Sequence, residues 1–336
     1  MNLARYFIRK IGWYLLVFFA ALVINFILPR LIPGNPVDAL VASMTRGGGA
    51  SGDAVKAIYE NYMREFGLDQ PMWKQFLTYV GNVLQGNLGT SFAQYPASVN
   101  TLIGQALPWS VALQLPAIIV GWVVGNIVGA IAAFKGGWFD RGIFLSSLFL
   151  SSIPPYCLAI ILLFVAAVQL GFFPVGGAYS FGLSPEFSLA FFGDAITYFW
   201  LPFWSLVVVF IGGQAVGMRS MAIYELGADY VNYGRGLGLS DNRITGYVFR
   251  NAMLPQITGL ALSISGLVGG ALVTELVFSY PGVGTLLFNA ISTVDYPVIQ
   301  AVTLIITLAV LLANFAVDIV NGLIDPRILA ARSGER

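Results

Sequence analysis

The sequence predicts an all-α integral membrane protein. It has six transmembrane helices, a folded helical extracytoplasmic insertion after the first helix, and an amphipathic cytoplasmic loop between the fourth and fifth. Three observations predict this fold. Of the 336 residues, 57% are hydrophobic and only 10% are charged, whereas soluble domains carry about 25% charged residues. Apolar runs reach the length of a membrane span. The basic residues are divided unevenly between the loops.

Six segments are apolar over roughly the 20 residues that a helix needs to cross the hydrocarbon core. Their predicted bounds are Ile11–Leu28, Leu107–Phe134, Ile143–Phe173, Tyr198–Met218, Ile257–Phe278 and Val298–Ile324. The first segment follows basic residues, as a secretory signal does. Its apolar run is longer than the about 7–15 residues of a signal, and no A-x-A site follows, so we expect an uncleaved helix. Pro154-Pro155 in the third segment predicts a kink.

Glycines recur at a spacing of four inside two of these segments, at Gly121, Gly125 and Gly129 and again at Gly266 and Gly270. Small residues at that spacing let helix backbones approach closely in a bilayer, where no hydrophobic force drives helices together. The pattern therefore predicts helix packing, and it carries no information about a substrate.

The Lys and Arg residues predict which side of the membrane each loop faces. Short cytoplasmic loops carry an excess of them, whereas long loops cross the membrane largely regardless of charge. The side of the two termini has 12 of the 17, and the two short loops opposite, Gly171–Thr197 and Ser279–Pro297, have none. The other five follow the first helix: Arg30, Arg46, Lys56, Arg64 and Lys74. Both termini are therefore predicted to be cytoplasmic, in a multi-pass protein of the inner or plasma membrane.

These assignments divide the chain into three parts. Residues 1–30 form the cytoplasmic N-terminus and the first transmembrane helix, and residues 31–105 form the extracytoplasmic insertion. Residues 106–336 form the core with helices two to six.

The insertion has the pattern of two helices. Asp53 can cap the first, whose apolar residues keep helical spacing up to Phe66, and Gly67 ends it. The second is predicted over Pro71–Leu84. The stretch Gly47–Gly52 before them is typical of a flexible loop.

The cytoplasmic segment 219–254 carries four arginines and two helical patterns. In the first, apolar residues step by three and four: Ile223, Leu226, Tyr230, Tyr233 and Leu237. After a turn at Gly238, Ser240 can cap a second helix that ends at Leu254-Pro255. Two short amphipathic helices around a glycine turn either rest on lipid headgroups or dock a soluble partner, and the residue pattern favours neither.

The residue types that are missing exclude several functions. Histidine is absent, which excludes histidine-dependent catalysis and most zinc sites. The one cysteine, Cys157, lies in an apolar run as a small hydrophobic residue. A net charge of +1 offers no basic surface for nucleic acid. No Gly-x-x-x-x-Gly-Lys-Ser/Thr phosphate loop occurs, so we expect no nucleotide, metal or other cofactor in this chain.

Several motifs resemble one known family. Asp229–Ser240 (DYVNYGRGLGLS) and Arg250–Pro255 (RNAMLP) resemble the coupling loop of ATP-binding-cassette importer permeases, most closely the B-type subunit of the dipeptide/oligopeptide/nickel permease family. Further matches follow the family's order over nearly the whole chain: Leu31–Pro36, Phe66–Pro71, Gly86–Gly89, Thr274–Gly284, Asp295–Val298 and Asp325–Arg327. One difference is Gly234-Arg235-Gly236-Leu237-Gly238, where the family usually has Ala-Arg-Ala-Lys-Gly. We expect each extra glycine to weaken the first loop helix by about 1 kcal/mol.

The resemblance implies partners and a role. Such permeases are not enzymes. They pair with a second homologous permease as a heterodimer, with two cytoplasmic ATPase subunits that bind ATP and Mg, and with an extracytoplasmic substrate-binding protein. The candidate residues for ATPase coupling are Asp229, Tyr230, Tyr233, Gly234, Arg235, Gly236, Gly238, Leu239, Leu254 and Pro255. The candidates for the translocation path or its outer gate are Glu275, Tyr280, Pro281, Gly282 and Gly284.

Two carboxylates inside predicted spans suggest other functions. Glu275 and Asp318 should face the bundle interior or a water-filled path, because a carboxylate in lipid is costly. We expect Asp318 to be a packing residue, and Glu275 either to line the path or to brace the gate. An ion-coupled secondary transporter would use both to relay protons, but the chain has no clear internal repeat. An intramembrane enzyme of the rhomboid type would need histidine, and no Gly-x-Gly-Asp signature occurs.

The cargo is predicted less directly. The resemblance favours short peptides, with oligosaccharides as the alternative and nickel chelates as a further cargo of the family. Aromatic residues in the outer regions stack well on sugar rings, although membrane interfaces use the same residues. For a peptide, Glu186, Asp194 and Asp295 would suit the ammonium end, and the outer loops that carry them offer no cation for the carboxylate end.

Overall fold

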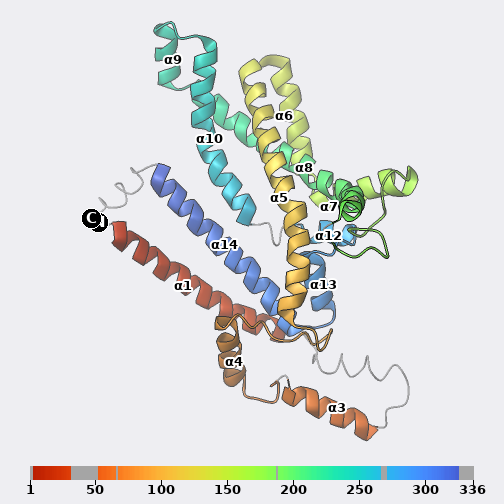
Figure 1. The fold of residues 1–336 in the computed structure, drawn as a ribbon. Coiled ribbons are helices and arrows are strands. Elements are labelled where there is room, and N and C mark those ends of the chain that lie inside the picture. The colour runs from red at the N-terminus through yellow and green to blue at the C-terminus, as the bar shows by residue number, and fades with distance from the viewer. Residues whose placement is uncertain (1–2, 32–51, 66, 187, 266–270, 325–336) are drawn as a thin grey trace. The chain divides into compact units, whose positions relative to one another are not determined.

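The computed structural model shows a helical fold. It describes residues 3–31, 52–65, 67–186, 188–265 and 271–324. Within these ranges every named element of regular structure is a helix (Figure 1), as the sequence predicts. Several features of the sequence lie outside the described residues: Gly47–Ser51, Phe66, Gly266, Gly270 and Asp325–Arg327.

Apolar helices of membrane-spanning length dominate the described residues. Four are long and apolar enough to cross a bilayer, and a bent helix pair raises the number to as many as five; the four cover Lys10–Leu31, Val99–Lys135, Leu189–Leu226 and Tyr296–Ala316. Leu15, Leu16 and Phe19 on the first of them are more than half exposed. Exposed apolar surface of this extent is unfavourable in water and suits lipid. The predicted span Ile257–Phe278 includes residues outside the described ones, so six crossings stay a prediction.

The bent pair confirms the predicted kink at Pro154-Pro155. Helix α6 (Gly137–Ser152) ends there, and α7 (Pro155–Leu162) follows it and continues as the π-helix η2 (Leu163–Gln169), at an angle of 90° to α6. A proline disfavours the helical conformation for the residue before it, and Ile153 is extended. The kink therefore follows from the two prolines themselves.

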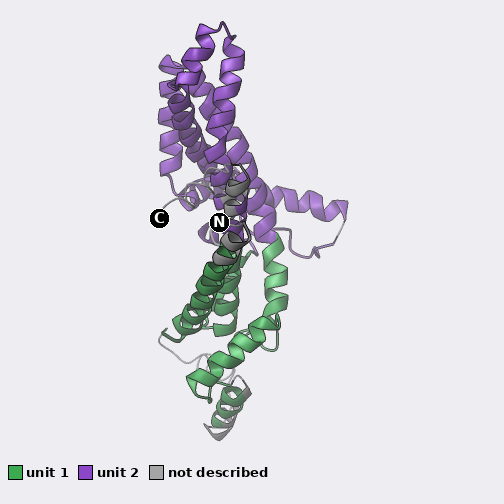
Figure 2. Ribbon diagram, turned by 90° about the vertical axis from the view of Figure 1, so that its left-hand side faces the viewer, with its two compact units in different colours: residues 1–108, 282–311 green, residues 109–281, 312–336 purple. Residues whose placement is uncertain are grey.

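The chain forms two compact units (Figure 2). Unit 1 comprises residues 1–108 and 282–311, and unit 2 comprises residues 109–281 and 312–336. Helices α5 (Val99–Lys135) and α14 (Tyr296–Ile324) contribute residues to both units. The predicted division of the chain at residues 30 and 105 was made from the membrane pattern, and it stays a prediction.

Unit 1 contains the first span and the helices of the insertion. Its elements are α1 (Leu3–Ile27), the short η1 (Leu28–Leu31), α3 (Gly52–Glu65), α4 (Met72–Leu84) and α13 (Val283–Ser292). Helix α3 ends as predicted at Gly67, whose φ is +64°, and the amide of Leu68 donates to the carbonyl of Met63 at 2.9 Å. Phe26 of α1 contacts Phe76 of α4, with 5.2 Å between ring centroids.

Unit 2 is a bundle in which α5 packs closely on α8 (Leu189–Leu226). A Cβ on Gly125 would lie 2.6 Å from Gln214 Cβ and 2.8 Å from the carbonyl oxygen of Ile211, and Gly121 and Gly129 face α8 equally closely. Contacts this short leave no room for a side chain. The predicted packing role of Gly121, Gly125 and Gly129 is therefore confirmed.

A mostly buried ion pair joins α6 to α8. Arg219 Nε donates to Asp140 Oδ1 and its Nη2 to Oδ2, both at 2.5 Å, and the guanidinium lies 4.4 Å from the centre of the Phe144 ring. A bidentate pair of this kind fixes both the distance and the rotation of two helices. Sequence reasoning did not find this pair, because its members are far apart in the chain.

Candidate functional site

The segment 219–254, which the sequence predicts to be cytoplasmic, contains a helix pair at one end of unit 2 (Figure 1). Helix α9 (Asp229–Gly236) is followed by α10 (Asp241–Ser265), and the turn between them lies at Gly238, whose φ is +75°. The amide of Gly238 donates to the carbonyl of Arg235 at 3.0 Å, and the amide of Leu239 donates to that of Gly234 at 3.1 Å. This is the Schellman hydrogen-bond pattern, which requires the left-handed conformation that glycine adopts without strain.

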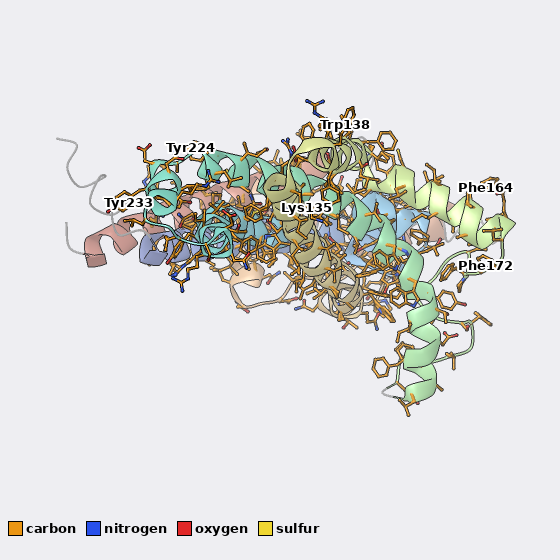
Figure 3. The ribbon with its side chains drawn as sticks, turned by 90° about the horizontal axis from the view of Figure 1, so that it is seen from above. Lys135, Trp138, Phe164, Phe172, Tyr224 and Tyr233 are labelled. Carbon is orange, nitrogen blue, oxygen red and sulfur yellow. The ribbon has the colours of Figure 1, made fainter. Side chains whose placement is uncertain are left out.

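The two faces of α9 differ. Val231 and Gly234 are buried against Ile244 and Val248 of α10, and a Cβ on Gly234 would lie 3.3 Å from Leu239 Cδ1. Tyr233 is 71% exposed, and Tyr233 and Tyr224 both lie on the outside of this end of the unit (Figure 3). The small buried glycine lets α9 sit close to α10, while the opposite face remains open.

The exposed face of α9 carries most of the predicted coupling residues. The predicted coupling residues exposed here are Asp229, Tyr230, Tyr233, Arg235 and Gly236 and, beyond the helix, Gly238. Tyr230 Oη donates to Glu225 Oε2 at 2.7 Å, which ties α9 to the last turn of α8. Burial raises the pKa of Tyr230 and the bond to Glu225 raises it further, so the phenol keeps its proton.

Two boundaries predicted for this loop are wrong. The stepped pattern from Ile223 to Leu237 belongs to two helices, because α8 continues to Leu226 and α9 begins only at Asp229. Its aromatic members therefore form the exposed face of α9, and the buried face is made by smaller residues.

The second loop helix does not end at Leu254-Pro255. Both residues are exposed and lie inside α10, which runs on to Ser265. A proline inside a helix removes one backbone hydrogen bond, and neighbouring helices can satisfy the groups this frees. Here the indole of Trp122 on α5 donates to the carbonyl of Gln256 at 2.9 Å, which holds α10 against α5 beside the proline.

Glu275 is the most deeply buried carboxylate for which the structure gives side-chain contacts. It lies on the short helix α12 (Leu272–Val277) and is 1% exposed. Ser110 Oγ of α5 donates to Oε1 at 2.6 Å, and Gln114 Nε2, one turn further along α5, lies 3.4 Å from the same oxygen. These contacts stabilise a buried polar group that would otherwise be costly, and they join α12 to α5.

An aromatic cluster lies next to these residues in unit 2. The ring of Trp109, which precedes Ser110, stacks on Tyr179 with 5.7 Å between centroids and meets Tyr280 edge-on at 5.8 Å. Phe191 completes the cluster, 5.6 Å from Tyr179. Burial raises the pKa of Tyr280 and Glu275 raises it further, so this phenol stays neutral.

Of the other predicted gate residues, Pro281 belongs to unit 2, and Gly282 and Gly284 belong to unit 1. Gly282 caps α13 with its carbonyl, which accepts from the amide of Leu286 at 3.0 Å, and Gly284 is buried in the same helix. Pro281 is exposed. The side chain of Asp318 lies outside the described residues, so the packing role expected for it stays a prediction.

Two of the three carboxylates expected to suit a peptide's ammonium group have structural partners instead. Asp194 accepts from both the amide and the hydroxyl of Ser180, at 2.6 Å each. Asp295 is buried and accepts from Ser91 Oγ at 2.5 Å and from the amides of Phe92 and Ala93 at 3.1 Å. Both hold loops in place, which leaves Glu186 as the exposed member of the set.

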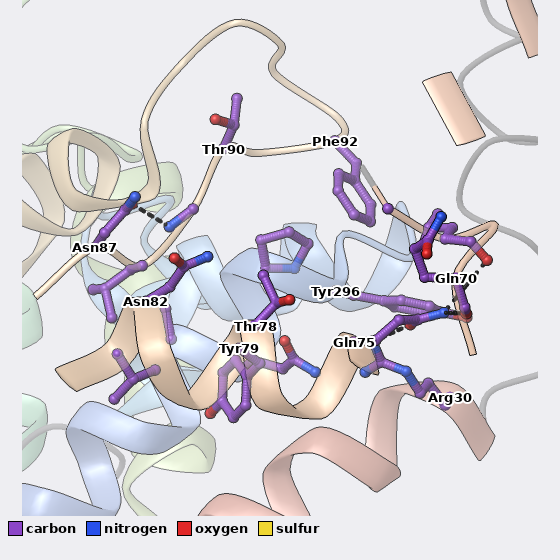
Figure 4. Close-up of a pocket in the computed structure, with 18 of the residues that line it drawn as sticks. Arg30, Gln70, Gln75, Thr78, Tyr79, Asn82, Asn87, Thr90, Phe92 and Tyr296 are labelled. Carbon is purple, nitrogen blue, oxygen red and sulfur yellow. Dashed lines mark hydrogen bonds between the residues drawn. The ribbon is translucent and has the colours of Figure 1, made fainter. Parts of the chain in front are cut away.

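Sequence reasoning also missed a pocket within unit 1 that three basic residues line (Figure 4). It has a volume of about 530 Å³ and is lined by residues of η1, α3, α4, the segment after α4, and the start of α14. The signal was present in the basic residues that follow the first predicted helix, but only the fold brings Arg30, Arg64 and Lys74 to one place. Among the described residues, no cluster of three or more metal-ligating side chains occurs.

These features define an α-helical integral membrane protein with a helix pair exposed at one end of its bundle. Comparison with known sequences then places it. The chain belongs to the family of binding-protein-dependent transport system inner membrane components, which its residues 125–330 match. Members of this family are permease subunits of ATP-binding-cassette importers and are not the catalytic subunits.

Relatives match over almost their full length. The di/tripeptide transport system permease protein DppB of Pseudomonas aeruginosa is 33% identical, with 95% of this chain and 97% of the relative covered. The oligopeptide transport system permease protein AppB of Bacillus subtilis and the dipeptide transport system permease protein DppB of Lactococcus lactis are each 30% identical, with 97% of this chain and 99% of each relative covered. The resemblance read from the coupling loop is thus confirmed at the level of the family.

Proposed function

We propose that this chain is the permease subunit of an ATP-binding-cassette importer that takes up short peptides. The observation that carries the proposal is the full-length similarity to permeases named for dipeptide, tripeptide and oligopeptide transport. These relatives are named for peptide transport and not for sugar transport, so the oligosaccharide alternative is not favoured. The ion-coupled transporter is not favoured either, because it leaves the family match unexplained.

The finer arrangement follows from the sequence. In our proposal the chain crosses the membrane six times with both termini in the cytoplasm, and residues 31–105 face the binding protein. A second homologous permease completes the path, and two ATPase subunits bind ATP and Mg on the cytoplasmic side. The distribution of basic residues supports this orientation.

In this proposal α9 is the docking element for an ATPase subunit. Its open face offers Tyr233 and Tyr230, and exposed aromatic residues are frequent anchors at protein interfaces. Because α9 packs on α10 and is tied to α8 through Tyr230 and Glu225, a push on α9 would reach both helices directly. Movement of an ATPase subunit would thus be passed to the membrane helices.

Copurification tests the docking role. Tyr233→Glu removes an exposed side chain without touching the buried face, so it should leave the permease in the membrane and reduce the ATPase recovered with it at least tenfold. Trp73→Glu on α4 is the matched control, because Trp73 is exposed to a similar degree on the insertion. Undiminished recovery of the ATPase with Tyr233→Glu would remove α9 from the interface.

For Glu275 we propose a bracing role beside the outer gate. Its bonds to Ser110 and Gln114 hold α12 to α5, and the aromatic cluster of Trp109, Tyr179 and Tyr280 lies against the same elements. A carboxylate engaged in this way is suited to fixing the position of the gate. Glu275→Gln should therefore preserve ATP-driven uptake at reduced rate, whereas a proton relay would lose its coupling.

The cargo is tested on the cognate binding protein, because that subunit selects the solute. Tripeptides should bind it far more tightly than cello- or xylo-oligosaccharides in a calorimetric titration. Tight sugar binding with no peptide binding would replace peptides by oligosaccharides as the cargo.

A further inference from the structure

The pocket in unit 1 is positively charged. Three basic residues line it, Arg30 from η1, Arg64 from α3 and Lys74 from α4, and its lining contains no Asp or Glu. Its volume of about 530 Å³ falls within the roughly 300–1,000 Å³ of small-molecule sites. A concave surface with three cations and no carboxylate concentrates anions from solution.

Within the described part of the chain, these cations have no acidic partner. Lys74 Nζ donates to the neutral side chain of Gln70 at 3.0 Å. Arg30 donates to the carbonyl of Phe26 at 2.8 Å and to Gln75 Oε1 at 2.9 Å. The ion pair of Asp140 and Arg219 shows that this protein can pair its charges where structure demands it. In the pocket, the basic side chains have no carboxylate beside them in the described part of the chain, so an anion can bind them.

Contacts with Phe26 and Gln75 fix the position of the Arg30 guanidinium. Its guanidinium lies 3.6 Å from the centre of the Phe26 ring, and Gln75 fixes one of its nitrogens. Gln75 is itself held by a bond of 2.8 Å from Nε2 to the carbonyl of Gln70. A guanidinium has five N–H donors, and two take part in the bonds described. The remaining donors and the planar fork suit a carboxylate.

Further side chains of α4 line the same pocket. The hydroxyl of Tyr79, another pocket residue, is buried and has no hydrogen-bond partner among the described residues. Burial raises the pKa of Tyr79 to about 12, so the group remains a donor. Asn82 and Thr78 add further polar groups from α4 to the same pocket (Figure 4).

We infer that this pocket is a subsite for the free carboxylate end of a short peptide. The inference rests on the proposed peptide transport and deepens it, because the outer loops considered from the sequence offered that end no cation. Arg30 receives the carboxylate, Lys74 and Arg64 attract it, and Gln75 is the positioning residue that orients Arg30.

Charge-selective labelling of one cysteine tests the site in the assembled transporter. Thr78 points into the pocket (Figure 4), so Thr78→Cys in a Cys157→Ser background places a thiol there. An anionic and a cationic methanethiosulfonate reagent are compared. The labelling rate with the anionic reagent, divided by the rate with the cationic reagent, should be about tenfold higher at Thr78→Cys than at Leu84→Cys. Leu84 is an exposed position on the same helix outside the pocket. Lys74→Gln and Arg30→Gln should each lower the ratio several-fold, and Lys56→Gln, an equal charge change on α3, should not. Equal ratios at the two cysteines would overturn the inference, and Lys74→Gln keeps the test open if Arg30→Gln fails to fold.

Protection by peptide identifies the ligand. Trialanine at millimolar concentration should slow labelling of Thr78→Cys, and trialanine amide should not. Equal protection by both peptides, or protection by phosphatidylglycerol in nanodiscs without peptide, would overturn the carboxylate assignment. ATP-driven peptide uptake without protection would end this inference and leave the proposed function intact. Absence of peptide uptake would end the proposed function itself.

Discussion

Two glycines near the turn between α9 and α10 should respond to the same substitution with opposite changes in stability. Gly236 and Gly238 are both exposed, and a Cβ added to either would meet no atom within 4 Å. They differ in backbone conformation, because Gly236 is in α9 and Gly238 has a φ of +75°. Sterics therefore cannot explain a difference between Gly236→Ala and Gly238→Ala, and backbone conformation can.

The expected magnitudes follow from that difference. Alanine in a helix is favoured over glycine by about 1 kcal/mol, so Gly236→Ala should stabilise α9 by up to that amount. A non-glycine residue in the left-handed region costs about 1–2 kcal/mol, so Gly238→Ala should destabilise the turn by that amount. Gly238→Asn should cost less, because asparagine tolerates this conformation.

Hydrogen exchange of residues 229–240 in nanodiscs measures the effect. One or two kcal/mol corresponds to a factor of about 5–30 in an opening equilibrium. Amide exchange should therefore slow by up to about fivefold in Gly236→Ala and quicken by about 5–30-fold in Gly238→Ala. If both variants change the exchange in the same direction, or if Gly238→Ala exchanges like the wild type, the Schellman turn does not hold this loop.

Three further predictions concern packing, the ion pair and orientation. Gly125→Leu should lower the free energy of unfolding by about 1–3 kcal/mol or more, and with it the thermal unfolding midpoint, because the added atoms meet the α8 backbone. Gly104→Leu on the same helix has open space and is the control, so equal midpoints for the two variants would contradict this prediction. A double-mutant cycle of Asp140→Asn and Arg219→Gln should give a coupling of about 1–3 kcal/mol in the free energy of unfolding, and additive effects would show that the pair stabilises nothing. In the Cys157→Ser background, Lys56→Cys should label from outside intact cells with an impermeant reagent and Ser240→Cys should not; labelling of Ser240→Cys from outside would reverse the proposed orientation.

The parts of the fold that depend on local sequence could be predicted. Proline and glycine act on their own neighbours, so the start of α4 after Pro71, the end of α3 at Gly67 and the kink at Pro154 follow from the residues themselves. The glycines of α5 could be assigned to packing because their spacing repeats on one helix face, although the partner helix could not be named.

The parts that depend on distant residues could not. Pro255 predicts a helix end, yet α10 continues through it to Ser265, and Trp122 of another helix donates to the carbonyl of Gln256 beside it. Asp295 looks free in the sequence, but the fold brings Ser91 to it from 204 residues away. The charged pocket combines Arg30 with Gln75 in the same way. Residues that meet only in the tertiary structure leave no periodic signal in the sequence.

Peptide uptake by the reconstituted transporter is the most direct test of the proposed role. The chain would be purified with its partner permease and ATPase subunits, placed in proteoliposomes with the binding protein on one side, and supplied with ATP and Mg on the other. We predict uptake of a radiolabelled tripeptide that requires both ATP and the binding protein and persists in a protonophore. Uptake driven by a proton gradient without ATP, or no peptide uptake by an assembled complex that hydrolyses ATP, would contradict the assignment as a peptide importer permease.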